Sequence, residues 1–323
     1  MSPSLPSVDR RHFLAAGAIT GAGLALGASA MPQALAAEAA AGAVELPFKI
    51  SIAEYSLHRL IGEKKLDPRD FGPFCKKHFD AEAVEYWMGP FSDKGKDHAY
   101  MDEMHKKSVD AGVKELLIMC DIPDGKGDLG NPDDDKRREA AEVHFQWVEA
   151  AQKMGCHSIR VNARSEGTRE EQAARAADGL RQLCEFAAPH KINVIVENHG
   201  GLSSDGTWLA GVMKLVNLPN CGTLPDFGNF QTSPGVWYDK YQGTAEMMPF
   251  AKAVSAKSHV FDKDGNEAEI DYRKMVKIVL DAGYHGHLGV EWEGPEPKDE
   301  IEGVLLTKRL LEKIRQEVME AKS

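Results

Sequence analysis

Short apolar runs and longer amphipathic stretches alternate along this chain of 323 residues from about Phe48 onward. The apolar runs have the length of strands, and the stretches between them carry the apolar spacing that a helix buries on one face. We expect strands at Lys49–Ser56, Glu82–Tyr86, Glu115–Met119, Ser158–Asn162, Asn193–Glu197, Gly222–Asp226, Ala256–Phe261 and His287–Trp292. We expect helices at Pro68–His78, Asp97–Ala111, Asp134–Met154, Arg169–His190, Thr207–Asn217, Thr244–Ala253, Tyr272–Ala282 and Glu300–Lys322. A helix after each strand makes consecutive strands parallel.

Eight strands alternating with eight helices predict an α/β fold with a single (β/α)8 barrel of the TIM type. The alternative is an open, doubly wound sheet, but no glycine-rich phosphate fingerprint follows the first strand. We expect one catalytic domain over residues 47–323. Two unusually long loops, 120–133 and 228–243, follow strands and are expected at the catalytic face. The second is predicted to pack toward a substrate through its aromatic residues Phe230, Trp237, Tyr238 and Tyr241.

Residues 1–36 have the features of an export signal. Arg10 and Arg11 precede an apolar stretch that is too short and too rich in Ala and Gly for a good transmembrane helix. Small-x-small sites predict cleavage after Ala30 or Ala36. The paired arginines indicate the twin-arginine (Tat) export machinery, which places the folded protein in the periplasm or another extracytoplasmic space. The alternative is an uncleaved membrane anchor; we expect no stable membrane insertion.

The formal net charge of −11 makes nucleic acid an unsuitable partner, because phosphate backbones attract basic surfaces. The five cysteines lack CxxC spacing and are odd in number, so we expect no disulfide framework and small buried side chains instead. A homo-oligomer is compatible with the sequence, which carries no signature of an interface.

Four residues of metal-binding type stand at the ends of consecutive expected strands. They are Glu197, Asp226, His259 and Glu291, and successive members are 29, 33 and 32 residues apart. About thirty residues is one strand-plus-helix unit, so each comes from the next unit along. The carboxyl ends of the strands meet at one mouth of a barrel. Three carboxylates and an imidazole meeting there predict a site for one divalent ion. The oxygen-rich ligands favour Mn²⁺, with Mg²⁺, Co²⁺ or Zn²⁺ as alternatives.

The motifs around these residues resemble those of the sugar phosphate isomerase/epimerase family, the xylose-isomerase-like TIM barrels. The motifs are ENHGG, LPDFGNF, KSHVFD and GVEWEG, and the resemblance extends from about Ile50 to Ile314. It implies that Glu197, Asp226, His259 and Glu291 hold the ion and that the two glutamates also exchange protons with the substrate. Two positions depart from the pattern: Asn229 replaces a histidine, and Phe261 replaces a lysine. Both departures concern contacts with the substrate.

The resemblance implies a metal-dependent sugar isomerase or epimerase. A carboxylate removes the proton beside a carbonyl, and the cation stabilises the resulting enediolate. A small-molecule carbohydrate without phosphate is the expected substrate, because only Arg164 and Lys263 supply positive charge near the active-face loops. Two alternatives stay open. One is a lyase that cleaves 3-keto-glycosides by β-elimination with the same base and metal. The other is a barrel that binds carbohydrate without turning it over.

Further residues near the strand ends are candidates for contacts with the sugar. They are His199, Asn162, Glu85, Trp87, His58, Lys257 and Asn229. Lys257 is expected to point inward below His259 and to pair with the ligand carboxylates. Arg160 shares a strand face with Asn162 and is expected to be a buried ion-pair partner. Glu293 is expected either beside the ligands or in solvent.

Overall fold

The computed structural model of this chain describes residues 46–123 and 125–321. The predicted export signal and both predicted cleavage sites lie outside these residues. Leu46–Ser323 forms one compact unit. Within the described residues, no helix is both long enough and apolar enough to span a membrane.

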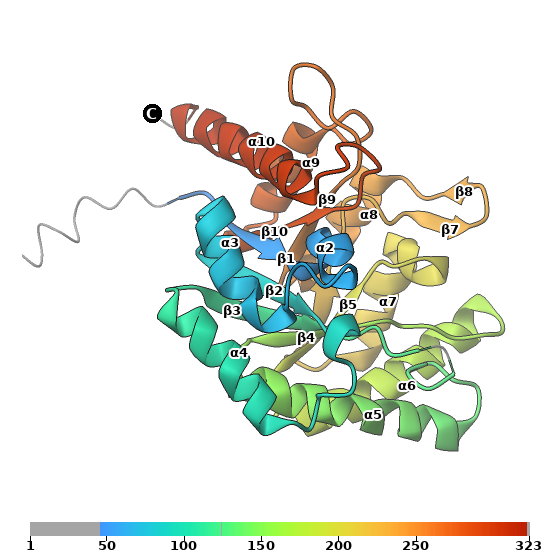
Figure 1. Cartoon of the computed structure of the whole chain (residues 1–323). Helices are drawn as coiled ribbons and strands as arrows, with labels where there is room; N and C mark the ends of the chain where they lie inside the picture. The colour runs from blue at the N-terminus through green and yellow to red at the C-terminus, as the bar shows by residue number, and fades with distance from the viewer. Residues whose placement is uncertain (1–45, 124, 322–323) are drawn as a thin grey trace, which may run out of the picture. The chain divides into compact units, whose positions relative to one another are not determined.

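Eight parallel strands form the wall of the barrel (Figure 1). They are β1 (Lys49–Ala53), β2 (Ala83–Trp87), β3 (Lys114–Met119), β4 (Ser158–Val161), β5 (Asn193–Glu197), β6 (Cys221–Leu224), β9 (Val254–Ser258) and β10 (His287–Trp292). Neighbours in the wall follow chain order, and β1 pairs with β10. The edges β6 and β9 are joined by backbone hydrogen bonds. The N–H of Ser255 donates to the carbonyl of Pro225 over 2.9 Å, and the N–H of Phe227 donates to the carbonyl of Ser255 over 3.1 Å. The predicted fold class is confirmed.

The α-helices are α2 (His58–Gly62), α3 (Phe71–Phe79), α4 (His98–Asp110), α5 (Asp134–Lys153), α6 (Arg169–Ala187), α7 (Gly206–Val216), α8 (Lys240–Met247), α9 (Tyr272–Asp281) and α10 (Glu300–Glu320). The longer helices surround the strands, whereas the short α2 lies in front of them in the view of Figure 1. A side-chain oxygen caps the first turn of each helix from α4 to α10, which satisfies backbone N–H groups that have no partner within the helix. The capping residues are Asp97, Asp133, Thr168, Asp205, Asp239, Asp271 and Asp299.

Three differences from the sequence prediction lie in the second half of the chain, near the site. The strand expected at Ala256–Phe261 is Val254–Ser258, because β9 pairs with β10 along its whole length and the chain then turns away. The helix expected at Thr244–Ala253 begins at Lys240, where Asp239 caps it. The long loop 228–243 contains an antiparallel hairpin of β7 (Gln231–Ser233) and β8 (Val236–Trp237), which stands away from the barrel wall in Figure 1.

Two apolar clusters lie on opposite faces of the barrel wall. The larger one fills the space between strands and helices and includes the outward-facing side chains of the strands. The smaller one lies on the inner face and consists of Ala53, Leu117, Met119, Ile195, Leu224 and Ala253, with Tyr55 and Trp87 packed against it. Buried polar side chains, among them Ser51, Glu85 and Lys257, share the barrel interior with this small cluster. All five cysteines are buried.

A close approach between α6 and the long loop 120–133 depends on Gly179. A Cβ added there would lie 1.9 Å from the carbonyl oxygen of Leu129. We expect Gly179→Ala to lower the free energy of unfolding by about 1–3 kcal/mol, because backbone must move to admit the methyl group. Gly211 in α7 is the matched control, since its added Cβ meets nothing within 4 Å. Gly211→Ala should stabilise by up to about 1 kcal/mol. Urea denaturation measures both, and equal effects would contradict the prediction.

Candidate active site

Three buried carboxylates meet inside the barrel near the carboxyl ends of the strands. Glu197 ends β5, Asp226 follows β6, and Glu291 lies in β10. Each offers an oxygen, and these oxygens all lie within 4.8 Å of one another. Parallel strands carry their carboxyl ends to one side of the barrel, which is why residues far apart in sequence converge here. Three ionised carboxylates this close repel one another strongly, so the surroundings must supply positive charge or protons.

Lys257 supplies one of these charges. It lies in β9 directly opposite Glu291 in the strand register and is buried. Its Nζ lies 3.6 Å from Oδ2 of Asp226, 3.6 Å from Oε1 of Glu291 and 2.8 Å from Oε1 of Glu293. Burial favours loss of the proton, but the surrounding carboxylates outweigh it and raise the pKa of Lys257 well above its usual range. The expected pairing of Lys257 with the predicted ligand carboxylates is present, and Glu293 joins it.

Arg160 supplies the second charge from β4. Its guanidinium pairs with Glu197 on one side and with Asp121 on the other. Burial alone would raise the pKa of Asp121, but Arg160 lowers it to about 2. Trp87 Nε1 donates to Oδ2 of Asp121 over 3.0 Å. The buried guanidinium of Arg160 thus holds the Glu197 carboxylate in place, and the expected role of Arg160 as a buried ion-pair partner is confirmed.

Hydrogen bonds fix the remaining carboxylate oxygens. Oδ1 of Asp226 accepts from the backbone N–H groups of Gly228 and Asn229, both over 2.8 Å. The side-chain amide of Asn229 donates to Oε1 of Glu197 over 3.0 Å. The loop after β6 therefore aligns two of the three carboxylates.

Ser255 bridges the other pair. Its Oγ lies 2.8 Å from Oδ2 of Asp226 and 2.6 Å from Oε2 of Glu291. A hydroxyl carries one hydrogen, so both contacts are hydrogen bonds only when one of the two carboxyl groups is protonated and donates to Oγ. Burial raises the pKa of Asp226. Burial would also raise the pKa of Glu291, but Lys257 and Ser255 bring it below its ordinary value. The pair is therefore suited to share a proton.

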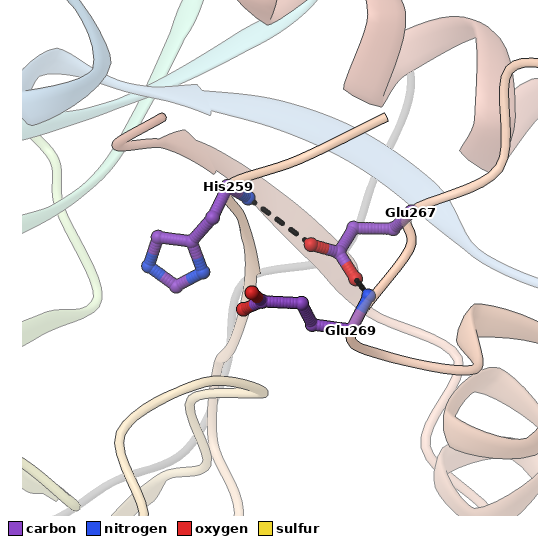
Figure 2. A group of neighbouring side chains, drawn as sticks. All are labelled: His259, Glu267 and Glu269. Carbon is purple, nitrogen blue, oxygen red and sulfur yellow. Dashed lines mark hydrogen bonds between the residues drawn. The ribbon is translucent and has the colours of Figure 1, made fainter. Parts of the chain in front are cut away.

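His259 does not join the three carboxylates. It follows the end of β9, and its ring falls into a separate group with Glu267 and Glu269 (Figure 2). In that group the Glu267 carboxylate accepts from the backbone N–H groups of His259, Val260, Glu269 and Ile270. Four backbone donors identify Glu267 as the residue that organises this loop. The predicted role of His259 as a metal ligand stays a prediction. Its ring is not grouped with the three carboxylates that the sequence placed beside it.

Glu85 lies deeper in the barrel. Its carboxylate accepts from Oγ of Ser51 over 2.6 Å and lies against Gly289, where an added Cβ would be 2.6 Å from both of its oxygens. Gly289 precedes Glu291 by one inward-facing position, so Glu85 lies one layer below the cluster. Burial, together with the charges of Glu291 and Glu197, raises the pKa of Glu85 to about 7.

The raised pKa of Glu85 makes stability depend on pH. The folded state keeps the proton up to about 7, whereas the unfolded chain loses it near the ordinary value of 4.5. Stability is therefore full below pH 4.5 and falls as pH rises to about 7. Glu85→Gln should remove this dependence of the free energy of unfolding on pH. The gain in stability of the variant over the wild type should therefore be larger at pH 8 than at pH 4.5, by up to about 3 kcal/mol. Urea denaturation at pH 5 and pH 8 checks this, with Glu82→Gln at the exposed start of the same segment as control.

The remaining predicted sugar contacts lie around the mouth. His58 stacks on Tyr55 at 4.7 Å between ring centroids, and Trp87 meets Tyr55 edge-on at 4.8 Å. Asn162 and His199 line a polar cavity of about 480 Å³ beside the ends of β4 and β5. The carbonyl oxygen Oδ1 of Asn162 is buried and has no hydrogen-bond partner among the described residues. It is a ready acceptor for a hydroxyl group of a ligand.

Sequence reasoning missed Asp121, Tyr55 and Ser255. Asp121 stands two residues after the end of β3, as Asp226 does after the end of β6. This position was the signal in the sequence that could have identified Asp121 as a site residue. Ser255 was missed because the predicted strand began one residue after it. Tyr55 lies in a 3₁₀ helix, Glu54–Leu57, which occupies the end of the strand that the sequence predicted. No local pattern marks it.

The comparisons with known proteins agree on the fold. A family model described as a xylose isomerase-like TIM barrel matches residues 74–315. No curated protein matches the chain. A xylose isomerase domain protein from Planctomyces limnophilus has a TM-score of 0.62 and 15% identity, covering 86% of this chain and 100% of its own. The IolI protein with a binding zinc atom has a TM-score of 0.62 and 15% identity, covering 84% and 99%. A D-psicose 3-epimerase with D-tagatose from Clostridium cellulolyticum H10 has a TM-score of 0.64 and 12% identity, covering 83% and 99%.

The three carboxylates could hold a divalent ion, and one structural neighbour carries zinc. Oxygen ligands and an excess of carboxylates over cations suit such an ion. The predicted set of four ligands is not assembled, however. The imidazole of His259 lies in another group, and the ammonium of Lys257 stands beside Asp226 and Glu291. The residues present thus fit the ion in ligand type and charge, but not as the predicted four-ligand site.

Proposed function

This chain belongs to the family of xylose isomerase-like TIM barrels, and from that premise we propose that it is an isomerase or epimerase that moves a proton beside the carbonyl of a carbohydrate. The observation that carries the proposal is the meeting of Glu197, Asp226 and Glu291 with two buried cationic side chains. Carboxylates held in place without water are effective bases, and a nearby positive charge stabilises the anion that forms.

Glu197 and Glu291 are the proposed proton-transfer residues. They come from different strands, β5 and β10, so they approach a bound molecule from different directions. One removes the proton from carbon, and the electron pair of the C–H bond moves toward the carbonyl oxygen. The other returns a proton to the same carbon or its neighbour, which gives an epimer or an isomer.

A positive charge beside the carbonyl oxygen is required by this step. A divalent ion on the three carboxylates would supply it when bound, as a Lewis acid. The ammonium of Lys257 offers the same charge from within the chain. The choice of Mn²⁺ stays a prediction from the sequence.

The proposed substrate is a carbohydrate without a phosphate group. The cavity beside Asn162 and His199 is lined by polar groups, and the Asn162 acceptor suits a sugar hydroxyl. A structural neighbour is a D-psicose 3-epimerase with D-tagatose, which is consistent with a ketose. Trp87 and Tyr55 offer apolar faces of the kind that pack against sugar rings.

Proton NMR in D₂O tests the proposed function. Free ketoses, inososes and 3-keto-glycosides are incubated with the protein, once with Mn²⁺ and once with a chelator, and paramagnetic ions are removed before the spectra are recorded. We expect deuterium to enter a carbon beside the carbonyl. A rearranged sugar supports the isomerase, whereas a released aglycone supports the 3-keto-glycoside lyase. Retention of a sugar without any exchange in the panel would contradict an enzyme and favour a carbohydrate-binding barrel.

We also propose that the chain is exported by the twin-arginine route, on the basis of Arg10 and Arg11 in the sequence. Replacing both arginines by lysine should retain the protein in the cytoplasm, because the translocation machinery recognises the arginine pair. Fractionation of a bacterial host with a Tat system, probed with an antibody to the barrel, measures this. Equal periplasmic amounts of both forms would contradict the proposal.

A further inference from the structure

We propose that an apolar cavity at the mouth of the barrel binds an apolar aglycone, so that the substrate is a glycoside rather than a free sugar. The inference rests on the proposed function, because it names the class of carbohydrate that the same site takes. It is carried by the lining of this cavity, by the aromatic rings that join it to the barrel interior and by its link to the polar cavity beside Asn162 and His199.

The apolar cavity lies between the loops that follow β1 and β2 and has a volume of about 480 Å³. Both loops leave the carboxyl ends of their strands, so the cavity is at the same end of the barrel as the carboxylates. Cavities that bind small molecules have volumes of about 300–1,000 Å³ and mostly apolar walls. The apolar side chains in this wall are Ile61, Leu66, Pro68, Trp87 and Pro90.

Three aromatic rings join the apolar cavity to the barrel interior. His58 and Trp87 line the cavity. Tyr55 lies against both, stacked on His58 at 4.7 Å and edge-on to Trp87 at 4.8 Å between ring centroids. Tyr55 and Trp87 also pack against the apolar cluster on the inner face of the wall. The cavity therefore shares its wall with the interior of the barrel and is not a separate hollow on the outer surface.

Asp121 links the apolar cavity to the polar one. Trp87 lines the first and Asn162 lines the second, and both side chains hold this carboxylate. Nε1 of Trp87 donates to Oδ2 over 3.0 Å, and Nδ2 of Asn162 donates to Oδ1 over 3.2 Å. The side chain of Asp121 is 34% exposed, so it can also accept from a hydroxyl group of a ligand. The walls of the two cavities thus meet at one accessible acceptor.

A ligand that matches both cavities has a polar part and an apolar part. A free ketose carries oxygen on every carbon, so it fits the polar cavity but gains little from walls such as Ile61 and Leu66. A glycoside with an apolar aglycone fits both. The anomeric carbon of a glycoside has no free carbonyl group, and the proposed proton transfer needs one. The substrate is therefore a glycoside with a ketone on its sugar ring, a keto-glycoside.

Calorimetry with matched pairs of glycosides tests the inference without any turnover. The probes are phenyl and methyl β-D-glucopyranoside, phenyl and methyl β-D-galactopyranoside, and the 3-keto forms of all four. We expect the phenyl member of a pair to bind about 10–100-fold more tightly, which corresponds to burial of one aromatic ring. Its heat capacity change on binding should also be more negative, because more apolar surface leaves water. Equal affinities within every pair, or no binding by any probe, would overturn the inference.

Two variants locate the bound ring. Gly62 lines the apolar cavity, and a Cβ added there meets nothing within 4 Å, so Gly62→Phe can fill the cavity without a clash. Gly89→Ala would place a Cβ 2.2 Å from Cζ2 of Trp87 and displace the indole from the wall. Both variants should lower the preference for phenyl over methyl at least about 5-fold, and Gly62→Phe should leave the affinity for the methyl glycoside unchanged.

Gly211→Phe on α7 is the matched control, because its added Cβ also meets nothing within 4 Å and it lines neither cavity. It should keep the wild-type preference, and circular dichroism verifies that all three variants fold. A phenyl preference that survives both Gly62→Phe and Gly89→Ala would place the ring elsewhere and contradict the inference. Phenyl preference without deuterium exchange in any keto-glycoside or ketose would contradict the proposed function alone. Exchange with equal affinities for phenyl and methyl would contradict only the inference.

Discussion

Glu197→Gln is expected to lower the rate of deuterium entry beside a substrate carbonyl by about 10²–10⁴-fold, because an amide cannot accept the proton. The glutamine keeps an oxygen for the Asn229 amide that now donates to Glu197 over 3.0 Å, and Arg160 keeps its pair with Asp121. The loss should therefore be chemical rather than structural. Proton NMR in D₂O measures the rate, and circular dichroism verifies the fold.

Two variants serve as comparisons for this result. Glu291→Gln should lose exchange to a similar extent, since the second carboxylate completes the proton transfer. Glu82→Gln stands at an exposed position before β2 and should exchange at the wild-type rate. Sugar binding by Glu197→Gln, followed by calorimetry, should persist. Exchange that survives in both Glu197→Gln and Glu291→Gln would remove these residues from the chemistry.

Arg160→Met is expected to be the most destabilising substitution in the barrel interior, with a loss of about 3–5 kcal/mol in the free energy of unfolding. Arg160 pairs with Glu197, which is fully buried, and with Asp121. Methionine would fill the space but leave buried carboxylate charge without a partner. Guanidinium chloride denaturation at pH 7 measures the loss.

Arg137→Met is the matched control for Arg160→Met. Arg137 is also buried, but its carboxylate partners Asp134 and Asp178 are 86% and 42% exposed. Water can solvate those carboxylates after the substitution, so we expect a clearly smaller loss. Combining Arg160→Met with Glu197→Gln should recover part of the stability, because one of the stranded charges is removed. Equal losses for the two arginine variants would contradict the assigned role of burial.

The sequence identified the three carboxylates of the site, but it did not predict that His259 would lie in a different group. Glu197, Asp226 and Glu291 converge because strand ends in consecutive units must meet at one mouth. The sequence grouped His259 with them because histidine is a common metal ligand and because His259 lies one strand-plus-helix unit after Asp226. The sequence placed it within a strand that in fact ends at Ser258. Lys257, which the sequence placed on the same inward face, meets the carboxylates, whereas His259 lies just past the end of the strand.

What the sequence by itself determined is the alternation of strands and helices, the barrel it implies and the three carboxylates at its mouth, because each follows from local periodicity and chain order. What only the tertiary structure decided is which carboxylates the two expected cations meet: Arg160 pairs with Asp121 and Glu197, and Lys257 also meets Glu293. The pairing of Lys257 with Glu291 and of Arg160 with Asp121 joins distant segments through strand register. Register is set by packing and hydrogen bonds across the whole barrel wall, and no local pattern encodes it.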